Sequence, residues 1–422
     1  ISGTNPNLSG SGTWSSSSQL SMNYTGTLTA LSDISFLNAT NVSFGSSFLI
    51  GTFNLNFNNV SLNISGSTMT SSGGKMLFQG TNTISGSNLI TAPIEILSGT
   101  TNASNTLGSS VTVFSGAIFG CNLSSATVNN DLTVNSGGTL TGTSCSIVFN
   151  GVNFVNNGSV TVPTLSFQRS GNQNISGTGT YNNPSGTISL SVSGTKFLLN
   201  DLTTNYTINA GAILDLTNRI LTTTRAGNAI TGGSSAITTG STIIYAGTAA
   251  QDINQNINYN NLTINNPAGA SLGGSGDTYI NGILTIENGA IFNHSQWRLW
   301  LNGNGTPFVN NGGTYAPTTS SEVIYNGTTQ QTALVTTYNA LRVPNPQGIV
   351  LNGDVTVNLS FNLNGGIVEI VNNTITLGNT CSIFRTTGYV IGNLRKLNNS
   401  GGVVGFTYHV GTANGYWPLN AV

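Results

Sequence analysis

Short runs of alternating hydrophobic and polar residues recur along most of the chain, and turns rich in Gly, Asn, Ser and Thr separate them. The clearest runs cover residues 126–129, 132–134, 146–149, 159–162, 187–192 and 355–361. Alternation with a period of two predicts strands of about 4 to 6 residues that bury one face. We see no convincing apolar periodicity of 3.6 residues, so the pattern predicts an all-β protein.

The strands belong to a short repeated unit that reads as strand, tight glycine turn, strand. Residues 113–119 recur as 134–140, which is 21 positions later (134 − 113), and the same unit returns at 208–214 and 286–292. The turn positions are Gly116, Gly137, Gly211 and Gly289. Glycine suits a turn that needs positive φ, where a Cβ would clash. A 21-residue spacing with two or three strands predicts one rung of a right-handed parallel β-helix, a solenoid.

A longer repeat contains the shorter one. Residues 241–251 return as 321–331, with Tyr245 and Tyr325 separated by 80 positions (325 − 245). We interpret this spacing as about four rungs of one continuous coil. The alternative is a tandem array of β-sandwich domains, each of about 80 residues. We favour the β-helix because the glycine units recur at 21 residues and no Cys…Trp…Cys frame is present.

The repeat pattern also predicts where the coil begins and ends. Residues 1–19 are polar and irregular, so we expect an N-terminal cap or docking segment there. Residues 20–400 are expected to form the continuous β-helix. Residues 401–422 depart from the repeat and are expected to be a C-terminal cap or the start of a following domain. Such caps matter because solenoid ends expose unpaired strand edges.

Charge is scarce, since Asp, Glu, Lys and Arg make up 5% of the chain, against about 25% in an ordinary soluble domain. The 10 Lys and Arg residues form no cluster larger than Arg395 and Lys396. This composition argues against nucleic acid and anionic membranes as partners, because both require a basic face. No apolar run is long enough for a membrane-spanning helix, so none is expected.

The titratable residues show no catalytic pattern. β-Helix enzymes that cleave polysaccharides need two or three neighbouring carboxylates. The 11 acidic residues here are scattered, without an Asp-Asp or Asp-x-Asp pair. With two His residues and no Cys-x-x-Cys, a zinc site is not expected either. We therefore expect no enzymatic activity, no cofactor and no metal.

Cysteine and tryptophan supply two candidate features. The chain has three cysteines, Cys121, Cys145 and Cys381. Cys145 and Cys381 read first as small buried thiols at strand starts, and a Cys121–Cys145 bridge between neighbouring coils is the alternative. In residues 297–301, alternation places Trp297 in the core and Trp300 outside, next to Arg298. An exposed Trp beside an Arg predicts a glycan-stacking site, and aromatic packing on a rung is the alternative.

Several segments resemble the repeats of a known group of proteins. Residues 259–269, 282–291, 388–396 and 409–418 are similar to units in large secreted surface proteins of Bacteroidota and related bacteria, many of them exported by the type IX pathway. The resemblance covers most of residues 76–422. It implies a β-helix displayed outside the cell, and it brings no catalytic residues. One departure is that we see no C-terminal sorting domain, so we expect a processed or partial chain.

These observations favour an extracellular structural protein. We expect a β-solenoid rod that forms a cell-surface filament, sheath or adhesin stalk, with itself as the partner, end to end or laterally. The basis is the repeats, the scarcity of charge and the absence of an acid–base constellation. A glycan-binding adhesin that recognises surface glycans is the alternative. A polysaccharide-degrading β-helix enzyme is the least favoured reading.

Overall fold

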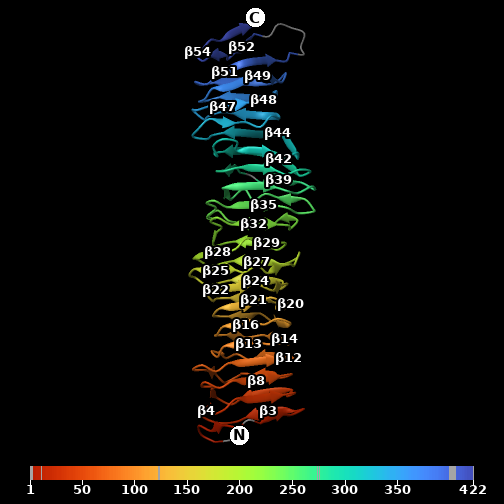
Figure 1. The fold of residues 1–422 in the computed structure, drawn as a ribbon, viewed down its shortest axis with the longest axis vertical. Helices are drawn as coiled ribbons and strands as arrows, with labels where there is room; N and C mark the ends of the chain where they lie inside the picture. The colour runs from red at the N-terminus through yellow and green to blue at the C-terminus, as the bar shows by residue number, and fades with distance from the viewer. Residues whose placement is uncertain are drawn as a thin grey trace. The chain divides into compact units, whose positions relative to one another are not determined.

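The computed structural model describes residues 3–10, 12–121, 124–272, 274, 276–398 and 405–421 of the 422-residue chain. Within these ranges the protein consists of strands and turns, with no helix. The strands stack in parallel as a β-solenoid of about 18 turns with rungs of roughly 21 residues. The predicted parallel β-helix is therefore confirmed. The chain divides into two compact units, Ile1–Asp215 and Leu216–Val422, and Figure 1 shows the strands stacked rung over rung in each.

Parallel sheets form the walls of the first unit. The longest contains β2 (Thr13–Ser15), β5 (Ile34–Leu37), β8 (Leu55–Asn58), β11 (Met76–Gln79), β13 (Ile94–Ile96), β16 (Val111–Val113), β19 (Leu132–Val134), β22 (Asn153–Asn156), β25 (Gln173–Ser176), β28 (Thr195–Leu198) and β31 (Ile213–Asp215). The second contains β3 (Gln19–Met22), β6 (Asn41–Phe44), β9 (Ser61–Asn63), β12 (Thr81–Ser85), β14 (Gly99–Ala103), β17 (Ala117–Cys121), β20 (Thr139–Gly142), β23 (Ser159–Val160), β26 (Thr180–Tyr181) and β29 (Leu202–Thr204).

The third wall of this unit comes in two stretches that Ile90 connects by single bridges to Met69 and Leu107. The first stretch contains β1 (Asn7–Leu8), β4 (Thr27–Ala30), β7 (Ser47–Leu49) and β10 (Met69–Thr70). The other contains β15 (Thr106–Leu107), β18 (Ala126–Val128), β21 (Ser146–Phe149), β24 (Thr164–Phe167), β27 (Thr187–Leu190) and β30 (Thr207–Ala210). Each rung thus crosses three walls before it returns to the first.

The second unit also has three faces, and their strands merge toward its C-terminal part. Its first face holds β32 (Ile220–Thr223), β35 (Thr242–Tyr245), β38 (Asn261–Ile264), β41 (Leu284–Ile286) and β43 (Phe308–Asn310). Its second holds β33 (Gly227–Asn228), β36 (Gln251–Asp252) and β39 (Ala270–Leu272). Its third holds β37 (Asn258–Tyr259) and β40 (Thr278–Ile280). Strand β34 (Ile230–Gly232) lies between β33 and β35 in the chain.

Longer strands then turn a corner and join the second face to the third. The long strands are β42 (Ile291–Leu301), β44 (Thr314–Tyr325), β48 (Val355–Leu363) and β49 (Val368–Leu377). The shorter strands of this part are β45 (Gln331–Thr332), β46 (Thr337–Arg342), β47 (Ile349–Leu351), β50 (Ser382–Arg385) and β51 (Val390–Lys396). The last strands are β52 (Phe406–Tyr408), β53 (Gly411–Thr412), β54 (Gly415–Tyr416) and β55 (Leu419–Ala421). Continuous strands of this kind let side chains from two faces lie on one ladder.

Rung length varies more than a strict repeat implies. In the longest sheet of the first unit, paired residues are separated by as few as 17 positions, from Ile94 to Val111. The separation reaches 23 positions in β25 and β28, where Ile175 pairs with Leu198. Extra residues are accommodated at the corners, because the strands themselves must stay in register to keep their hydrogen bonds.

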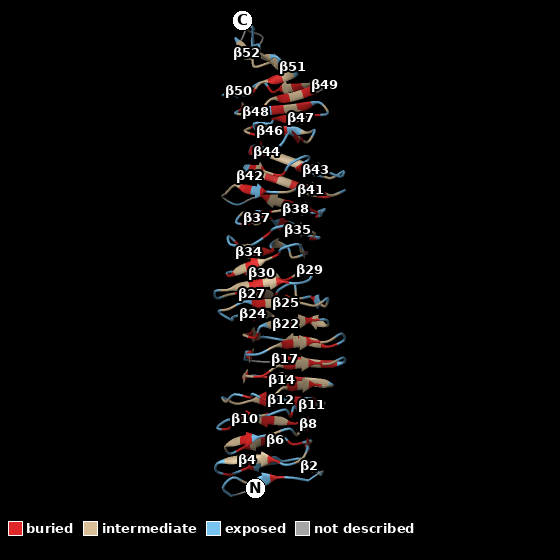
Figure 2. Ribbon diagram, turned by 60° about the vertical axis from the view of Figure 1, so that its left-hand side comes forward, coloured by how far each residue is buried: buried red, intermediate tan, exposed pale blue. Residues whose placement is uncertain are grey.

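The core lies inside the coil, where alternate residues of every strand point. Figure 2 shows buried and partly exposed positions alternating along the rungs. Phe36, Phe57 and Phe78 occupy successive rungs in register, with ring centroids 5.3 and 4.9 Å apart and nearly parallel planes. These rings are all fully buried. Parallel in-register stacking places like side chains over one another, so one aromatic position supports the next.

The predicted glycine turns are of two kinds. Gly116, Gly137 and Gly289 have φ of 74°, 78° and 74°, in the left-handed region that the sequence argument requires. Gly211 joins β30 to β31 without positive φ, so that argument is wrong for this residue. A Cβ on Gly211 would lie 3.2 Å from the carbonyl oxygen of Leu190 on the preceding rung. Close approach between rungs is therefore the constraint at this position.

The 80-residue repeat spans about four rungs of one coil, as the sequence suggested, but it is not a whole number of turns and does not return to the same face. Tyr245 lies in β35 on the first face, and its ladder reaches Asn310 after three turns and 65 residues (310 − 245). Tyr325 lies 15 residues further on, on the third face, where its ladder descends through Leu301 to Tyr259. The repeat therefore spans three turns plus two faces.

The ends of the solenoid differ in strand direction. Strands β1, β2 and β3 pair in parallel with β4, β5 and β6, so the coil already includes residues that the sequence boundary at 19 assigned to a separate segment. At the other end, β52 pairs antiparallel with β55 and β53 with β54. A bridge from Val390 to Val410 attaches this part to the coil. Residues 399–404 and 422 lie outside the described ranges, and a capping role stays a prediction.

Candidate functional site

Several acidic side chains close the corners between rungs. The Oδ1 atoms of Asp33, Asp131 and Asp354 accept hydrogen bonds of 2.8, 2.9 and 2.8 Å from backbone N–H groups of the following rung. Asn54 does the same with the N–H of Lys75 at 3.1 Å. Asp thus replaces Asn in a structural role, because both offer an acceptor oxygen at the same position. These carboxylates are engaged in holding the coil together.

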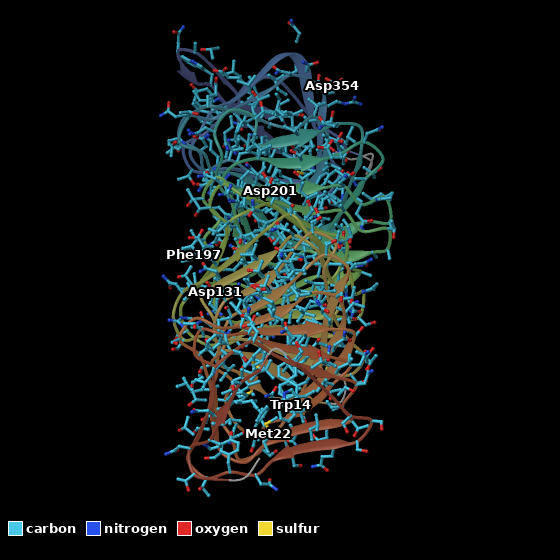
Figure 3. All side chains as sticks on the ribbon, turned by 60° about the horizontal axis from the view of Figure 1, so that its bottom comes forward. Trp14, Met22, Asp131, Phe197, Asp201 and Asp354 are labelled. Carbon is cyan, nitrogen blue, oxygen red and sulfur yellow. A yellow bond between two sulfur atoms is a disulfide. The ribbon has the colours of Figure 1, made fainter. Side chains whose placement is uncertain are left out.

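Polar side chains also form ladders on the outside of the first unit. Asn153 donates through Nδ2 to Asp131 at 3.0 Å, and Asn174 donates to Asn153 at 2.8 Å. The next residue of this ladder is Phe197, in register with Asn174. Figure 3 labels Asp131 and Phe197, which lie on the same side of the molecule. Polar side chains on consecutive rungs are therefore bonded to one another along this ladder, up to Asn174.

A different set of side chains points inward and donates to corner carbonyls. Gln173 donates through Nε2 to the carbonyls of Phe149 and Gly151, at 3.1 and 2.9 Å. On the next rung, in register, the buried Lys196 donates through Nζ to the carbonyl of Arg169 at 2.7 Å. Burial, and then the charge of Arg169, lower the pKa of Lys196. Glutamine and lysine thus serve one purpose, which is to donate hydrogen bonds to corner carbonyls from inside the coil.

The long repeat encodes one such network twice. In its first copy the Tyr245 and Tyr259 hydroxyls lie 3.0 Å apart, and Gln251 accepts from the N–H of Gly247 at 2.7 Å and from Asn266 at 2.9 Å. The second copy has the matching contacts, each of 3.0 Å. The hydroxyls of Tyr325 and Tyr338 are bonded to each other, and Gln331 accepts from the N–H of Gly327 and from Asn345. Burial raises the pKa of each of these tyrosines. The residues shared by the two copies are therefore structural.

An outer cluster of ionic and aromatic residues lies on the third face of the second unit. Arg298 donates through Nε to Asp277 at 2.9 Å, and Arg342 donates to Glu322 at 2.8 Å. The hydrogen bond to Asp277 raises the pKa of Arg298. Surface pairs of this kind add little stability. The outer cluster brings together two acidic and two basic side chains of a chain with few charges, and their charges neutralise one another.

The predicted glycan-stacking pair, Trp300 and Arg298, is part of this outer cluster. The Trp300 ring stacks on Tyr279 with centroids 5.8 Å apart, and its Nε1 donates to Asp277 at 3.1 Å. On the following rung, Trp300 is in register with Ile324, which is fully buried. Along the ladder, Trp300 thus has Tyr279 on the preceding rung and Ile324 on the following one. Trp300 and Arg298 lie on the outer face, as the sequence suggested, but much of their bonding capacity is already used.

Trp297 lies outside the core, so the sequence interpretation of this residue is wrong. Its side chain is 43% exposed and its φ is 70°. A register shift between His294 and Gln296 breaks the alternation on which the interpretation rested. The buried His294 donates through Nε2 to the Trp297 carbonyl at 3.0 Å and accepts through Nδ1 from Tyr315 at 2.9 Å. Burial lowers the pKa of His294 to about 4, which keeps the ring neutral.

A polar groove of about 620 Å³ opens in the second unit. Its lining comes from three consecutive rungs and consists of Asn228, Ile230, Thr231, Gly232, Asp252, Ile253, Asn254, Gln255, Asn256, Gly274 and Gly276. Asp252 is the one charged residue among them. No sequence motif predicted this groove, since its residues are spread over nearly fifty positions and resemble other Asn- and Gly-rich corners.

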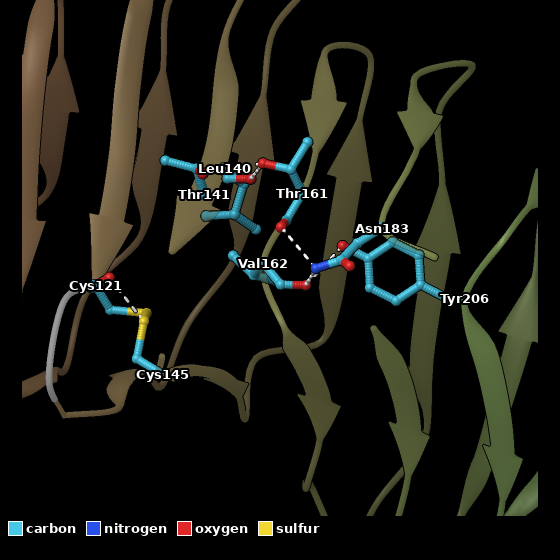
Figure 4. Close-up of a disulfide and its surroundings, with 8 residues drawn as sticks. All are labelled: Cys121, Leu140, Thr141, Cys145, Thr161, Val162, Asn183 and Tyr206. Carbon is cyan, nitrogen blue, oxygen red and sulfur yellow. Dashed lines mark hydrogen bonds between the residues drawn. A yellow bond between two sulfur atoms is a disulfide. The ribbon is translucent and has the colours of Figure 1, made fainter. Parts of the chain in front are cut away.

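Cys121 and Cys145 form a disulfide in this structure, with their Cα atoms 5.9 Å apart (Figure 4). The bridge joins neighbouring rungs, and its formation in solution stays a prediction. Figure 4 also shows Asn183 donating to the Thr161 carbonyl at 3.1 Å, another contact between rungs. The third cysteine, Cys381, is free and buried, and burial raises the pKa of its thiol to about 11. It therefore remains a protonated, unreactive thiol.

The fold places the chain in the class of parallel β-solenoids. Comparison with known proteins finds no matching family model, no similar curated protein and no similar solved structure. In the described ranges, no helix is long and apolar enough to cross a membrane. Over the same residues, no three His, Cys, Asp or Glu side chains are grouped so that they could hold a metal ion.

Proposed function

We propose that the chain is an extracellular structural protein, a β-solenoid that builds a cell-surface filament, sheath or adhesin stalk by self-association. The observation that carries this proposal is the use of polar side chains between rungs. Asp33 and Asp131 cap backbone N–H groups, while Gln331 and Lys196 cap carbonyls. Residues that would perform chemistry in an enzyme serve here to hold one turn on the next.

The disulfide supports the extracellular location. Disulfides persist in oxidising compartments and are rare in reducing ones. The bond between Cys121 and Cys145 joins two rungs of the first unit, where reduction would loosen the corner. The resemblance of the repeats to secreted surface proteins of Bacteroidota points to the same location.

Weak charge supports self-association. The formal net charge is −1, with 10 basic and 11 acidic residues in the chain. Copies with so little net charge repel one another weakly. Outer ladders of amide groups, such as Asn302 bonded to Asn281 at 2.9 Å, also offer donors and acceptors that a second copy can match. Lateral packing between such walls fits the composition.

Sedimentation velocity over a wide range of protein concentration, combined with negative-stain microscopy, tests the proposal. We expect the sedimentation coefficient to rise with concentration and elongated assemblies to appear in the images. We also expect added salt to change the assembly little, because few charges contribute. Monomers alone at every concentration would contradict self-association, and a strong salt dependence would contradict the amide-based contact.

A second candidate function is glycan binding at Trp300 and Arg298, which their position on the outer face favours. A glycan array compares the wild type with Trp300→Ala. Unchanged binding in the variant would exclude this site. The stacking of Trp300 on Tyr279 and its bond to Asp277 make this candidate weaker than the structural one.

A further inference from the structure

One corner of the second unit is shared by consecutive rungs and carries the polar groove. The pairs that bracket this corner are Asp252 with Ser271, Asn258 with Tyr279, Leu272 with His294 and Thr278 with Leu299. Residues 253–257 therefore lie one rung before the segment that contains Gly274 and Gly276. Residues 295–298, with Trp297, form the same corner one rung later. Successive rungs are about 4.8 Å apart, so the groove and Trp297 are neighbours along the corner.

The lining of the groove is polar but almost uncharged. Side-chain amides come from Asn228, Asn254, Gln255 and Asn256, and the one ionic group is the exposed carboxylate of Asp252. No Lys, Arg or His is among the described lining residues. Amides both donate and accept hydrogen bonds, and a carboxylate accepts them. Such a surface suits a ligand that is rich in hydroxyl groups and carries no negative charge.

One lining group has no hydrogen-bond partner among the residues that the structure describes. Gln255 donates through Nε2 to the Gly276 carbonyl at 2.9 Å, but its Oε1 is buried with no hydrogen-bond donor among the described residues. A buried acceptor without a donor costs free energy unless a ligand or water supplies one. A Cβ on Gly274 would lie 2.2 Å from this oxygen, so only glycine leaves room beside it. The groove wall thus contains an amide oxygen whose hydrogen-bonding capacity is unused among the described residues.

Trp297 adds an apolar surface next to these polar groups. Its side chain is 43% exposed, although a large aromatic ring normally contributes to a core. Its φ of 70° is strained for a bulky residue, and such strain concentrates at ligand sites. The buried His294 fixes the backbone by donating to the Trp297 carbonyl at 3.0 Å. The surroundings therefore hold this ring outside the coil.

We propose that the groove and Trp297 together form a binding site for a neutral polysaccharide. Sugar hydroxyls would bond to Asp252, Gln255 and the neighbouring asparagines. The C–H face of a sugar ring would stack on Trp297, whose π face is electron-rich. The lining of the groove comes from three consecutive rungs, so the groove fits an extended chain that crosses them. No basic side chain is among the described lining residues of the groove, and Arg298, next to Trp297, is paired with Asp277, so the site disfavours anionic polysaccharides.

Affinity gel electrophoresis with soluble polysaccharides tests this site on the full chain. The neutral probes are xyloglucan, galactomannan, dextran and mixed-linkage β-glucan, and polygalacturonate is the anionic comparison. We expect at least one neutral polymer to retard the wild type. We expect Trp297→Ala and Asp252→Asn each to weaken binding about tenfold, which corresponds to about 1.4 kcal/mol. Trp417→Ala is the matched control, because this tryptophan is 66% exposed and is not among the groove's lining residues, and it should bind as the wild type does.

Three results would overturn the proposal. In the first, no neutral polysaccharide retards the protein. In the second, polygalacturonate binds most tightly. In the third, Trp300→Ala loses binding while Trp297→Ala retains it. Melting temperatures identify variants that fail to fold, and Asp252→Asn, at an exposed position, keeps the test valid if Trp297→Ala is unstable. Sedimentation of the same variants separates this site from the structural function, because the proposed self-association should not change.

Discussion

Replacing Gln331 with alanine removes four hydrogen bonds from one buried corner of the second unit. The side chain donates through Nε2 to the carbonyls of Leu301 and Gly303, at 2.9 and 2.6 Å. Its Oε1 accepts from the N–H of Gly327 and from Nδ2 of Asn345, both at 3.0 Å. Gln331 is 1% exposed, so water does not reach these partners in the folded protein.

The expected cost follows from these contacts. A hydrogen bond contributes about 1 kcal/mol net, and four of them give about 4 kcal/mol. Water that enters the vacated space would lower this figure, and poor packing around the space would raise it. Because a solenoid rung contacts mainly its neighbours, the loss should be concentrated in the rungs that carry Leu301 and Gly327.

Hydrogen exchange measured by mass spectrometry, together with urea unfolding, checks this prediction. Gln330→Ala is the matched control, because the adjacent glutamine is exposed and makes one long bond of 3.3 Å to Glu369. We expect the control to change stability by less than about 0.5 kcal/mol. Equal effects of the two substitutions, or faster exchange that is spread evenly over the protein, would refute the reasoning.

Three further predictions concern acid stability, the core and the disulfide. Burial lowers the pKa of His294 from 6.5 to about 4, so the neutral ring makes its full contribution to stability above pH 6.5. As the pH falls toward 4, the free energy of unfolding should decrease by about 3 kcal/mol, because the unfolded chain then binds a proton that the folded protein does not. Urea unfolding of His294→Gln should lack this pH dependence, and an unchanged slope would contradict it. Phe57→Ala, at the centre of the ring stack, should cost about 3 to 5 kcal/mol, whereas Phe384→Ala, at a residue that is 57% exposed, should cost much less in the same assay. Reduction of the Cys121–Cys145 bond, which spans 24 residues, should lower stability by about 3 kcal/mol, and non-reducing peptide mapping that finds both thiols free would count against the bond.

The fold was accessible from the sequence because the period and the turns are local signals. Gly116 and Gly137 mark the same corner on consecutive rungs, where the N–H of Gly116 donates to the carbonyl of Gly137 at 2.9 Å. Alternation holds at Leu299 and Leu301, which are both buried in the core. It fails at Trp297, because a register shift and a left-handed backbone change the direction of the side chain there. Neither feature leaves a trace in the order of apolar and polar residues.

The candidate site was less accessible. Trp300 and Arg298 are close in the sequence, so alternation alone places them on the outer face. Their partner Asp277 is 21 residues from Arg298 and resembles any other isolated acid until the rungs are aligned. The groove is harder still, because its Asn and Gly residues are among the most common types in the chain. An inward Lys196 is likewise hidden, since lysine on an apolar face reads as a break in the pattern.

The long repeat has a consequence for how such a chain can change in length. Its copies place Tyr245 and Tyr325 on different faces of the same coil, and each copy forms the same buried network. A segment that is not a whole number of turns can therefore be gained or deleted without loss of internal contacts. Such an event moves every later strand to another face. Insertions and deletions would then bring different residues together on the outer ladders. Genetic variation in length would thus rearrange the exposed surface while the buried network stays the same.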